Sequence, residues 1–259
     1  MGISRRQSLT LMAAAAALTT GPSRAQPEKQ RPIRLVVLDV GGTLIEDHGE
    51  VPSSMRSAFA GGGIDVSLAE IGEWRGASKL GMVRHFVELK SKPGPERDAL
   101  IRGIYDDFSR RANEAYQDVQ PIKGAEDTLK RLKQSNLLLA TTTGFDRPLY
   151  DMIFRHFDWH KYFAATVTSD EVVDGRPSPF MIFHAMEAAH VDRVAEVIAV
   201  GDTPLDLQAA SNAGVRGVIG VSSGAATPER LAREPHTHLL PSVAALPDLL
   251  AKDFGVPLR

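Results

Sequence analysis

Three aspartates in two distant segments are the residues best suited to chemistry. Asp39 ends an apolar run and is followed by Gly41 and Gly42, which leave room for a phosphoryl group to approach the carboxylate. Asp202 and Asp206 follow a second apolar run. If these carboxylates converge, they repel one another unless a cation joins them, and oxygen ligands are what magnesium prefers. The pattern predicts a magnesium site beside a carboxylate nucleophile, although each aspartate taken alone is also a common helix cap.

Two further segments carry groups suited to binding phosphate. Arg176 stands in Gly-Arg-Pro-Ser-Pro ahead of a predicted helix, where its charge can neutralise a transferring phosphoryl group. Thr142 and Thr143 end another apolar run, and hydroxyl and backbone N–H groups at such an end suit phosphate oxygens. A lone arginine is more often a solvated surface charge, and a threonine-rich strand end is common, so each segment is a weak signal by itself.

The apolar runs that precede these groups predict the fold. Runs that stay apolar without alternation are typical of strands buried on both faces of a parallel sheet. Such runs occur at 33–38, 137–142, 163–167, 197–200 and 215–221, with helical patterns such as 125–133 and 181–189 between them. Alternating strands and helices predict a doubly wound α/β fold with a mainly parallel sheet. Ligands of such sheets bind at the carboxyl ends of the strands, where Asp39, Thr142 and Asp202 fall.

The segment from residue 51 to 118 breaks this alternation. It carries helical patterns at 68–74, 79–89 and 96–116 and no clear strand, with glycine- and proline-bearing turns between them. Because it falls between the first two predicted strands, we interpret it as a helical cap domain inserted over the site. The predicted catalytic core then comprises residues 32–50 and 119–259.

Composition narrows the classes of function. The chain has 259 residues, enough for one substantial core and a small second domain. Its formal net charge of -2 argues against a nucleic-acid binder held by phosphate contacts. The sequence has no cysteine, which excludes disulfides, thiolate nucleophiles and cysteine-ligated zinc.

The N-terminus has the pattern of a targeting segment. Arg5 and Arg6 precede an apolar, alanine-rich run over residues 9–18, and small residues follow it. Paired arginines before a short apolar run are typical of a twin-arginine export signal. The run is shorter than the roughly 20 apolar residues of a membrane span, so no stable membrane anchor is expected. We predict an export signal at 1–25, a linker at 26–31 and a periplasmic protein, or a cytoplasmic one if the segment is only a basic tail.

The order of these four segments resembles that of the haloacid dehalogenase-like (HAD) superfamily of hydrolases, and the resemblance covers essentially all of the chain after the linker. It implies a Rossmann-like core in which Asp39 forms an aspartyl-phosphate intermediate. It further implies that Asp39, the backbone carbonyl of Gly41 and Asp202 hold Mg2+, with Asp206 in support. The residues that it assigns to the phosphoryl group are Thr142 and Arg176.

One departure from the superfamily pattern limits the reactions that the site can catalyse. Phosphatases of the superfamily usually carry a second aspartate two residues after the nucleophile, as acid and base for the leaving oxygen, whereas this chain has Gly41. Loss of a general acid costs about 10² to 10⁴ in rate. The chain is more similar to the phosphonatases, meaning phosphonoacetaldehyde hydrolase and its relatives. These also lack the second aspartate, and they cleave phosphorus from carbon, so the leaving group is not an oxygen that needs a proton.

The resemblance to phosphonatases implies a role for Lys79. In that subgroup a cap lysine forms a Schiff base with the aldehyde, and residues 75–79 of this chain align with the segment that holds it. Schiff-base chemistry needs a free amine, so Lys79 has to be desolvated or close to another cation. A solvated cap lysine and a phosphate clamp are the plainer interpretations. Arg75 and Met82 stand where authentic phosphonatases have methionine and histidine, and Arg75 is suited to a second anionic group on the substrate.

The sequence therefore predicts a magnesium-dependent hydrolase for a small phosphonate or phosphate, most like phosphonoacetaldehyde hydrolase. Two alternatives stay open, a phosphatase for small esters such as phosphoglycolate and a periplasmic ligand-binding relative without turnover. Haloacid dehalogenation is disfavoured, because it needs no magnesium yet Asp202 and Asp206 are present. The expected partner is the small substrate and not a nucleic acid, and a homodimer is left open.

Overall fold

Short apolar runs form a six-stranded sheet in the computed structural model, which describes residues 31–258. The strands are β1 (Leu35–Leu38), β2 (Leu138–Thr143), β3 (Ala165–Thr168), β4 (Val197–Gly201), β5 (Gly217–Val221) and β6 (His238–Leu240). All neighbouring pairs are parallel, in the order β3-β2-β1-β4-β5-β6. The predicted doubly wound α/β fold is confirmed. The sequence patterns missed β6, which is short and only half-buried.

The register of the central strands brings the ends of three segments together. β1 pairs with β2 on one side and with β4 on the other, and Leu38 lies opposite both Thr141 and Val200. The chain runs from β1 to β2 and β3 in one direction and then returns to β4 on the other side of β1. The strand order therefore reverses beside β1, and the carboxyl edge at such a point is where open α/β sheets bind ligands.

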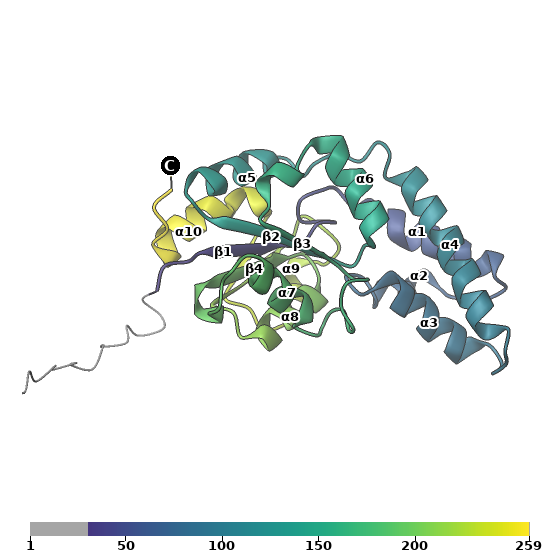
Figure 1. Cartoon of the computed structure of the whole chain (residues 1–259). Helices are drawn as coiled ribbons and strands as arrows, with labels where there is room; N and C mark the ends of the chain where they lie inside the picture. The colour runs from purple at the N-terminus through teal and green to yellow at the C-terminus, as the bar shows by residue number, and fades with distance from the viewer. Residues whose placement is uncertain (1–30, 259) are drawn as a thin grey trace, which may run out of the picture.

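Helices bury both faces of the sheet (Figure 1). One face packs against α5 (Ala125–Gln134), α6 (Arg147–Phe157) and α10 (Leu246–Phe254), the other against α7 (Phe180–Ala188) and α8 (Pro204–Ala213), and the short α9 (Pro228–Leu231) precedes β6. Along β1, Val36 and Leu38 belong to the first apolar cluster, and Leu35 and Val37 to the second. Side chains alternate between faces along a strand, so a strand with both faces covered must be apolar throughout.

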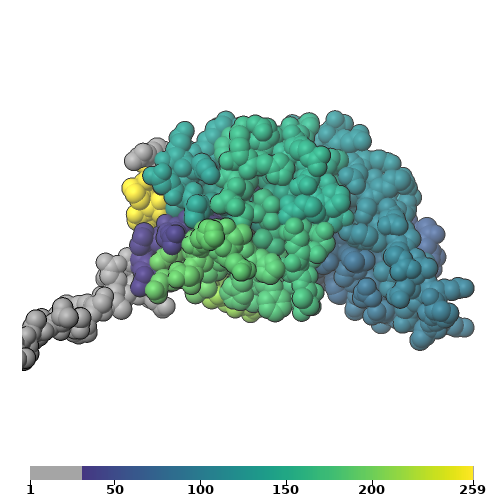
Figure 2. Space-filling view, in the orientation of Figure 1, coloured from purple at the N-terminus to yellow at the C-terminus, as the bar shows by residue number. Residues whose placement is uncertain are grey.

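Four helices separate β1 from α5 and β2. They are α1 (Glu50–Gly61), α2 (Leu68–Gly72), α3 (Lys79–Lys90) and α4 (Arg97–Ala115), and we call them the helical insertion. Met55, Phe59, Phe86 and Phe108 form its interior. The insertion lies at one end of the molecule, beyond the carboxyl ends of the strands (Figures 1 and 2).

The two ends of the helical insertion meet at the edge of the sheet domain. Ile45 forms an antiparallel bridge with Pro121, and the N–H of Ile122 donates to the carbonyl of Leu44 at 2.9 Å. α1 begins one residue before the boundary that we expected for the cap. The division into a cap at 51–118 and a core at 32–50 and 119–259 stays a prediction.

Two N-terminal predictions cannot be compared with the structure. The predicted export signal, residues 1–25, and residues 26–30 of the predicted linker lie outside the described residues. Within residues 31–258, none of the helices combines the length and the apolar character required to span a bilayer.

Candidate active site

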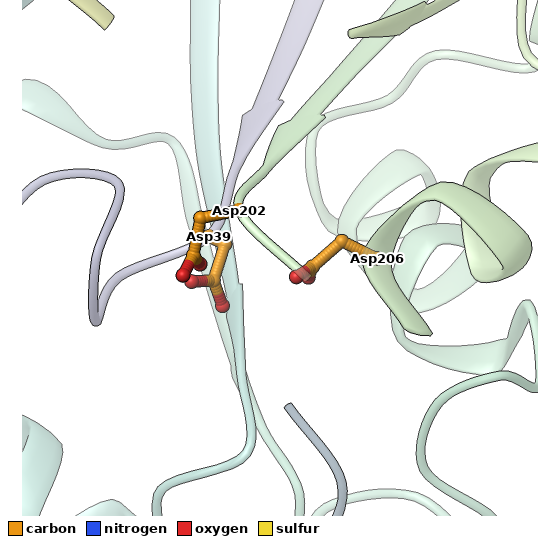
Figure 3. A group of neighbouring side chains, drawn as sticks. All are labelled: Asp39, Asp202 and Asp206. Carbon is orange, nitrogen blue, oxygen red and sulfur yellow. The ribbon is translucent and has the colours of Figure 1, made fainter. Parts of the chain in front are cut away.

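The three aspartates singled out from the sequence converge at the carboxyl edge of the sheet. Asp39 directly follows β1, Asp202 directly follows β4, and Asp206 lies in the first turn of α8. One carboxylate oxygen from each lies within 4.8 Å of the others, and all three side chains are buried. Figure 3 shows the carboxylates of Asp39 and Asp202 side by side, with Asp206 pointing toward them from its helix.

Burial of these like charges changes their acidity. Burial, and then repulsion from Asp206, raises the pKa of Asp39 to about 6 against the lowering effect of Arg176. Burial and the neighbouring charges of Asp39 and Asp206 raise the pKa of Asp202 well above its usual range. A divalent cation relieves this cost, and a buried set of carboxylate oxygens is the donor set that suits magnesium.

Arg176 already serves as the cation between two of the three aspartates. Its Nη1 lies 2.7 Å from Asp39 Oδ1 and 2.7 Å from Asp206 Oδ1. The other carboxylate oxygen of Asp206 accepts from the backbone N–H and hydroxyl of Thr203 at 3.0 and 2.5 Å, the capping box that begins α8. Both oxygens of Asp206 thus have partners within the protein, and Asp206 positions Arg176; its predicted support of a metal ion stays a prediction.

Asp202 is held in place by backbone. Its Oδ2 accepts from the N–H of Ala225 at 2.6 Å. A Cβ atom on Gly42 would lie 2.3 Å from Asp202 Oδ2, and one on Gly224 would lie 2.1 Å from it. Only glycine permits this approach, so the loops after β1 and β5 enclose the carboxylate beside Asp39.

A small pocket that is partly open to solvent lies over these residues. The residues predicted from the sequence that line it are Asp39, Gly41, Arg75, Lys79, Thr143, Arg176 and Asp202. Thr142 and Asp206 line a smaller space behind Arg176 instead. The pocket therefore has walls from both the sheet edge and the helical insertion.

The two threonines of β2 face different surroundings. Thr142 is covered by Arg176, whose Nη2 donates to its carbonyl at 2.7 Å and to its hydroxyl at 2.9 Å. Thr143 lines the pocket, and its hydroxyl accepts from the N–H of Phe145 at 3.2 Å. The resemblance named Thr142 as the phosphoryl ligand, and this geometry favours Thr143 for that position.

Lys79 reaches the pocket from the start of α3 and is 5% exposed. Its Nζ donates to the carbonyl of Ala77 at 2.9 Å and lies 5.8 Å from the centroid of the Phe145 ring. Within the described part of the chain Lys79 forms no ion pair. Burial, and then repulsion from Arg176, lowers its pKa to about 8 from the usual 10.5. The desolvated amine that Schiff-base chemistry requires is thus present in the pocket.

The pocket wall also contains residues that sequence reasoning did not predict, and three of them carry large or charged side chains: Asp47, Tyr116 and Phe145. Asp47 forms an ion pair with Arg75, Tyr116 follows α4, and the ring of Phe145 packs over Gly41. Nothing in the local sequence marks Asp47 or Tyr116, because both stand in segments that only the fold brings to the sheet edge. Phe145 follows a predicted strand end and could have been found by that rule.

Comparisons with known proteins identify the family of the chain. A family model described as haloacid dehalogenase-like hydrolase matches residues 33–214. The chain is 26% identical over 223 residues to a phosphonoacetaldehyde hydrolase of Bacteroides fragilis, covering 81% of this chain and 83% of that protein. It is 31% identical over 198 residues to that of Latilactobacillus sakei, covering 71% and 73%. A crystal structure of a phosphonoacetaldehyde hydrolase-like protein from Oleispira antarctica shares the fold, with a TM-score of 0.74, 23% identity and coverage of 85% and 92%.

Proposed function

The chain belongs to the haloacid dehalogenase-like hydrolases, and from this premise we propose that it cleaves the phosphorus–carbon bond of a small phosphonate that carries a carbonyl group. The observation that carries the proposal is that a buried lysine amine, Lys79, and the buried carboxylate of Asp39 line one pocket. A carbonyl compound bound there has its phosphorus end toward the sheet and its carbonyl end toward the helical insertion.

Residues at the carboxyl edge of the sheet act on the phosphorus end of the substrate. Asp39 attacks phosphorus through a carboxylate oxygen, and Arg176, fixed by Asp206, spreads positive charge over the transferring oxygens. Thr143 and the backbone around it supply hydrogen-bond groups at the same edge. Asp39, Asp202 and the carbonyl of Gly41 would hold Mg2+, which would neutralise negative charge at this edge when bound.

The lack of an acid at residue 41 fits a carbon leaving group. A Cβ atom on Gly41 would lie 3.3 Å from Cζ of Phe145, so a longer side chain there requires the ring to move. An alkoxide leaving group needs a proton from such a side chain, whereas a carbon leaving group needs somewhere to place its electron pair. This observation supports a phosphonate over an ordinary phosphate ester.

Lys79 provides a place for the electron pair of the broken phosphorus–carbon bond by forming an imine with the substrate. The free amine adds to the substrate carbonyl, and loss of water with uptake of one proton leaves a protonated imine. As Asp39 takes the phosphorus, the electron pair of the phosphorus–carbon bond moves toward the imine and leaves an enamine. Water then hydrolyses the aspartyl-phosphate to phosphate, and the enamine gains a proton and is hydrolysed to the aldehyde and free Lys79.

The deciding experiment compares phosphate release from phosphonoacetaldehyde and from phosphoglycolate, each with Mg2+. We expect the phosphonate to be turned over and the ester to be cleaved far more slowly. Preference for phosphoglycolate makes the protein a phosphatase. Magnesium-dependent binding of either compound without product makes it a binding relative.

We also propose that residues 1–25 direct export to the periplasm. Replacing both Arg5 and Arg6 with lysine should retain the protein in the cytoplasm, because twin-arginine export depends on the arginine pair. Cell fractionation followed by immunoblotting measures this. Equal amounts of wild type and variant in the cytoplasm would contradict it.

A further inference from the structure

The hydroxyl of Tyr116 is buried in the wall of the active-site pocket. Tyr116 is 2% exposed, lines the pocket and lies edge-on to Phe145, with ring centroids 5.3 Å apart. Among residues 31–258 its oxygen has no hydrogen-bond partner. Leaving a buried hydroxyl unpaired is unfavourable, so a hydroxyl in this position inside a pocket is suited to an acceptor that arrives with the ligand.

Arg75 adds further donors to the same wall. Its Nη2 pairs with Asp47, and the other N–H groups of its guanidinium have no partner in the described part of the chain. Asp47 uses both of its oxygens, since the second accepts from the N–H of Gly49 at 2.9 Å. The Asp47–Arg75 pair therefore brings guanidinium donors to the pocket wall, and both oxygens of Asp47 already accept a hydrogen bond within the protein.

Tyr116 and Arg75 line the same pocket. The charged groups around the Tyr116 hydroxyl are Asp47, Glu50, Arg75 and Asp39. Burial, and then the charge of Asp47, raises the pKa of Tyr116, so its hydroxyl stays protonated and can donate. Two donors, one of them charged, match the two oxygens of a carboxylate.

We propose that Tyr116 and Arg75 together bind a carboxylate on the part of the substrate remote from phosphorus. The substrate class is then a phosphonate that carries both a carbonyl and a carboxylate. This inference rests on the proposed function and names its substrate more closely. The phosphorus end is held at the sheet by Asp39 and Arg176, while Arg75 precedes α3 and Tyr116 follows α4, so both reach the pocket from the segment between β1 and α5.

The test uses calorimetric binding of two stable analogues to the full chain with Mg2+. 3-Phosphonopropionate carries the carboxylate and ethylphosphonate lacks it, and neither has the aldehyde or ketone carbonyl that the proposed cleavage requires, so neither should be turned over. We expect wild type to bind 3-phosphonopropionate more tightly. Tyr116→Phe should weaken that binding roughly tenfold, the size expected for one hydrogen bond to a charged group, and leave ethylphosphonate unchanged. Arg75→Gln should act in the same direction.

A matched control is Tyr162→Phe, which removes a hydroxyl that donates to Glu126 at 3.3 Å outside the pocket and should change neither affinity. The melting temperature of Tyr116→Phe should be unchanged or higher, because its hydroxyl has no protein partner. A lower melting temperature with equal loss of both affinities would assign Tyr116 a purely structural role and overturn the inference.

The remaining outcomes separate the two proposals. If wild type binds both analogues equally, or Tyr116→Phe weakens both by the same factor, the carboxylate site is wrong while the phosphonate site stands. If neither analogue binds, the proposed function fails and this inference fails with it.

Discussion

At the scale of single residues, Asp39 is the aspartate that both faces the pocket and touches Arg176. Asp39→Asn keeps the shape of the side chain but removes the nucleophilic carboxylate, so we expect turnover to fall by roughly 10³-fold or more. Phosphate release under saturating substrate measures it. Asp192→Asn, at an exposed aspartate outside this pocket, is the control and should be fully active. Near-normal turnover by Asp39→Asn would remove the covalent mechanism.

Lys79 is distinguished by its burial and its lowered pKa of about 8. Only the free amine forms an imine, so trapping by phosphonoacetaldehyde and borohydride should rise roughly tenfold per pH unit below 8 and level off above it. Intact mass spectrometry of the trapped protein gives the rate. If trapping instead keeps rising toward the usual lysine pKa of 10.5, the amine is not desolvated in the functional state.

Lys79→Arg tests the same residue without changing its charge. A guanidinium cannot form the imine, so labelling should disappear and phosphonate cleavage should fall by about 10³-fold. Lys90→Arg, at an exposed lysine on the same helix that pairs with Glu70, is the matched control. Labelling that persists in Lys79→Arg would place the chemistry elsewhere.

At the scale of elements, the loop after β2 carries the contact between sheet and insertion. A Cβ atom on Gly144 would lie 2.5 Å from the carbonyl oxygen of Ala77, 2.8 Å from Nζ of Lys79 and 2.9 Å from the carbonyl oxygen of Gly76. Two of these three are backbone atoms that cannot move aside cheaply. The fixed separation of Lys79 from the sheet edge therefore depends on a glycine at residue 144.

Gly144→Ala should push the insertion away from the sheet. We expect kcat/KM to fall by about 10- to 100-fold, because a displacement of about 1 Å can cost 10²-fold when reacting groups are held in place. Gly103→Ala, on the exposed face of α4 with nothing near its Cβ, is the control. It should keep activity and gain about 0.5–1 kcal/mol of stability, since alanine is the better helix former. Unchanged kcat/KM in Gly144→Ala would show that the contact is not required.

At the scale of the whole molecule, the buried aspartates couple stability to magnesium. Binding at 100 times Kd adds about 2.7 kcal/mol to the free energy of unfolding, which for a protein of this size raises Tm by roughly 5–10 °C. Differential scanning fluorimetry with and without Mg2+ measures the shift. In Asp202→Asn the shift should largely vanish, and without metal its Tm should equal or exceed that of wild type because one like charge has gone. A full shift in Asp202→Asn would exclude that residue as a ligand.

The fold follows from the sequence to the extent that each element carries its own pattern. β1 is apolar throughout because both of its faces are covered, and the apolar run at residues 33–38 predicted this buried strand. β6 lacks the pattern because it is short and half-buried, so only pairing with β5 defines it. The helical insertion was expected from its lack of strands. The Ile45–Pro121 bridge that joins its ends was not expected, because it is a contact between residues far apart in the sequence.

By itself, the sequence determined which groups meet at the sheet edge, because a residue that ends a parallel strand must lie at the carboxyl edge whatever surrounds it. Asp39 and Asp202 follow from that rule. Tertiary structure alone decided where each group points and what it contacts. Thr142 and Thr143 are neighbours on one strand, whose side chains project to opposite faces, and only packing determines which face is the pocket. Tyr116 reaches the pocket from a helix end that no local pattern links to Asp39, since their approach depends on how the insertion packs against the sheet.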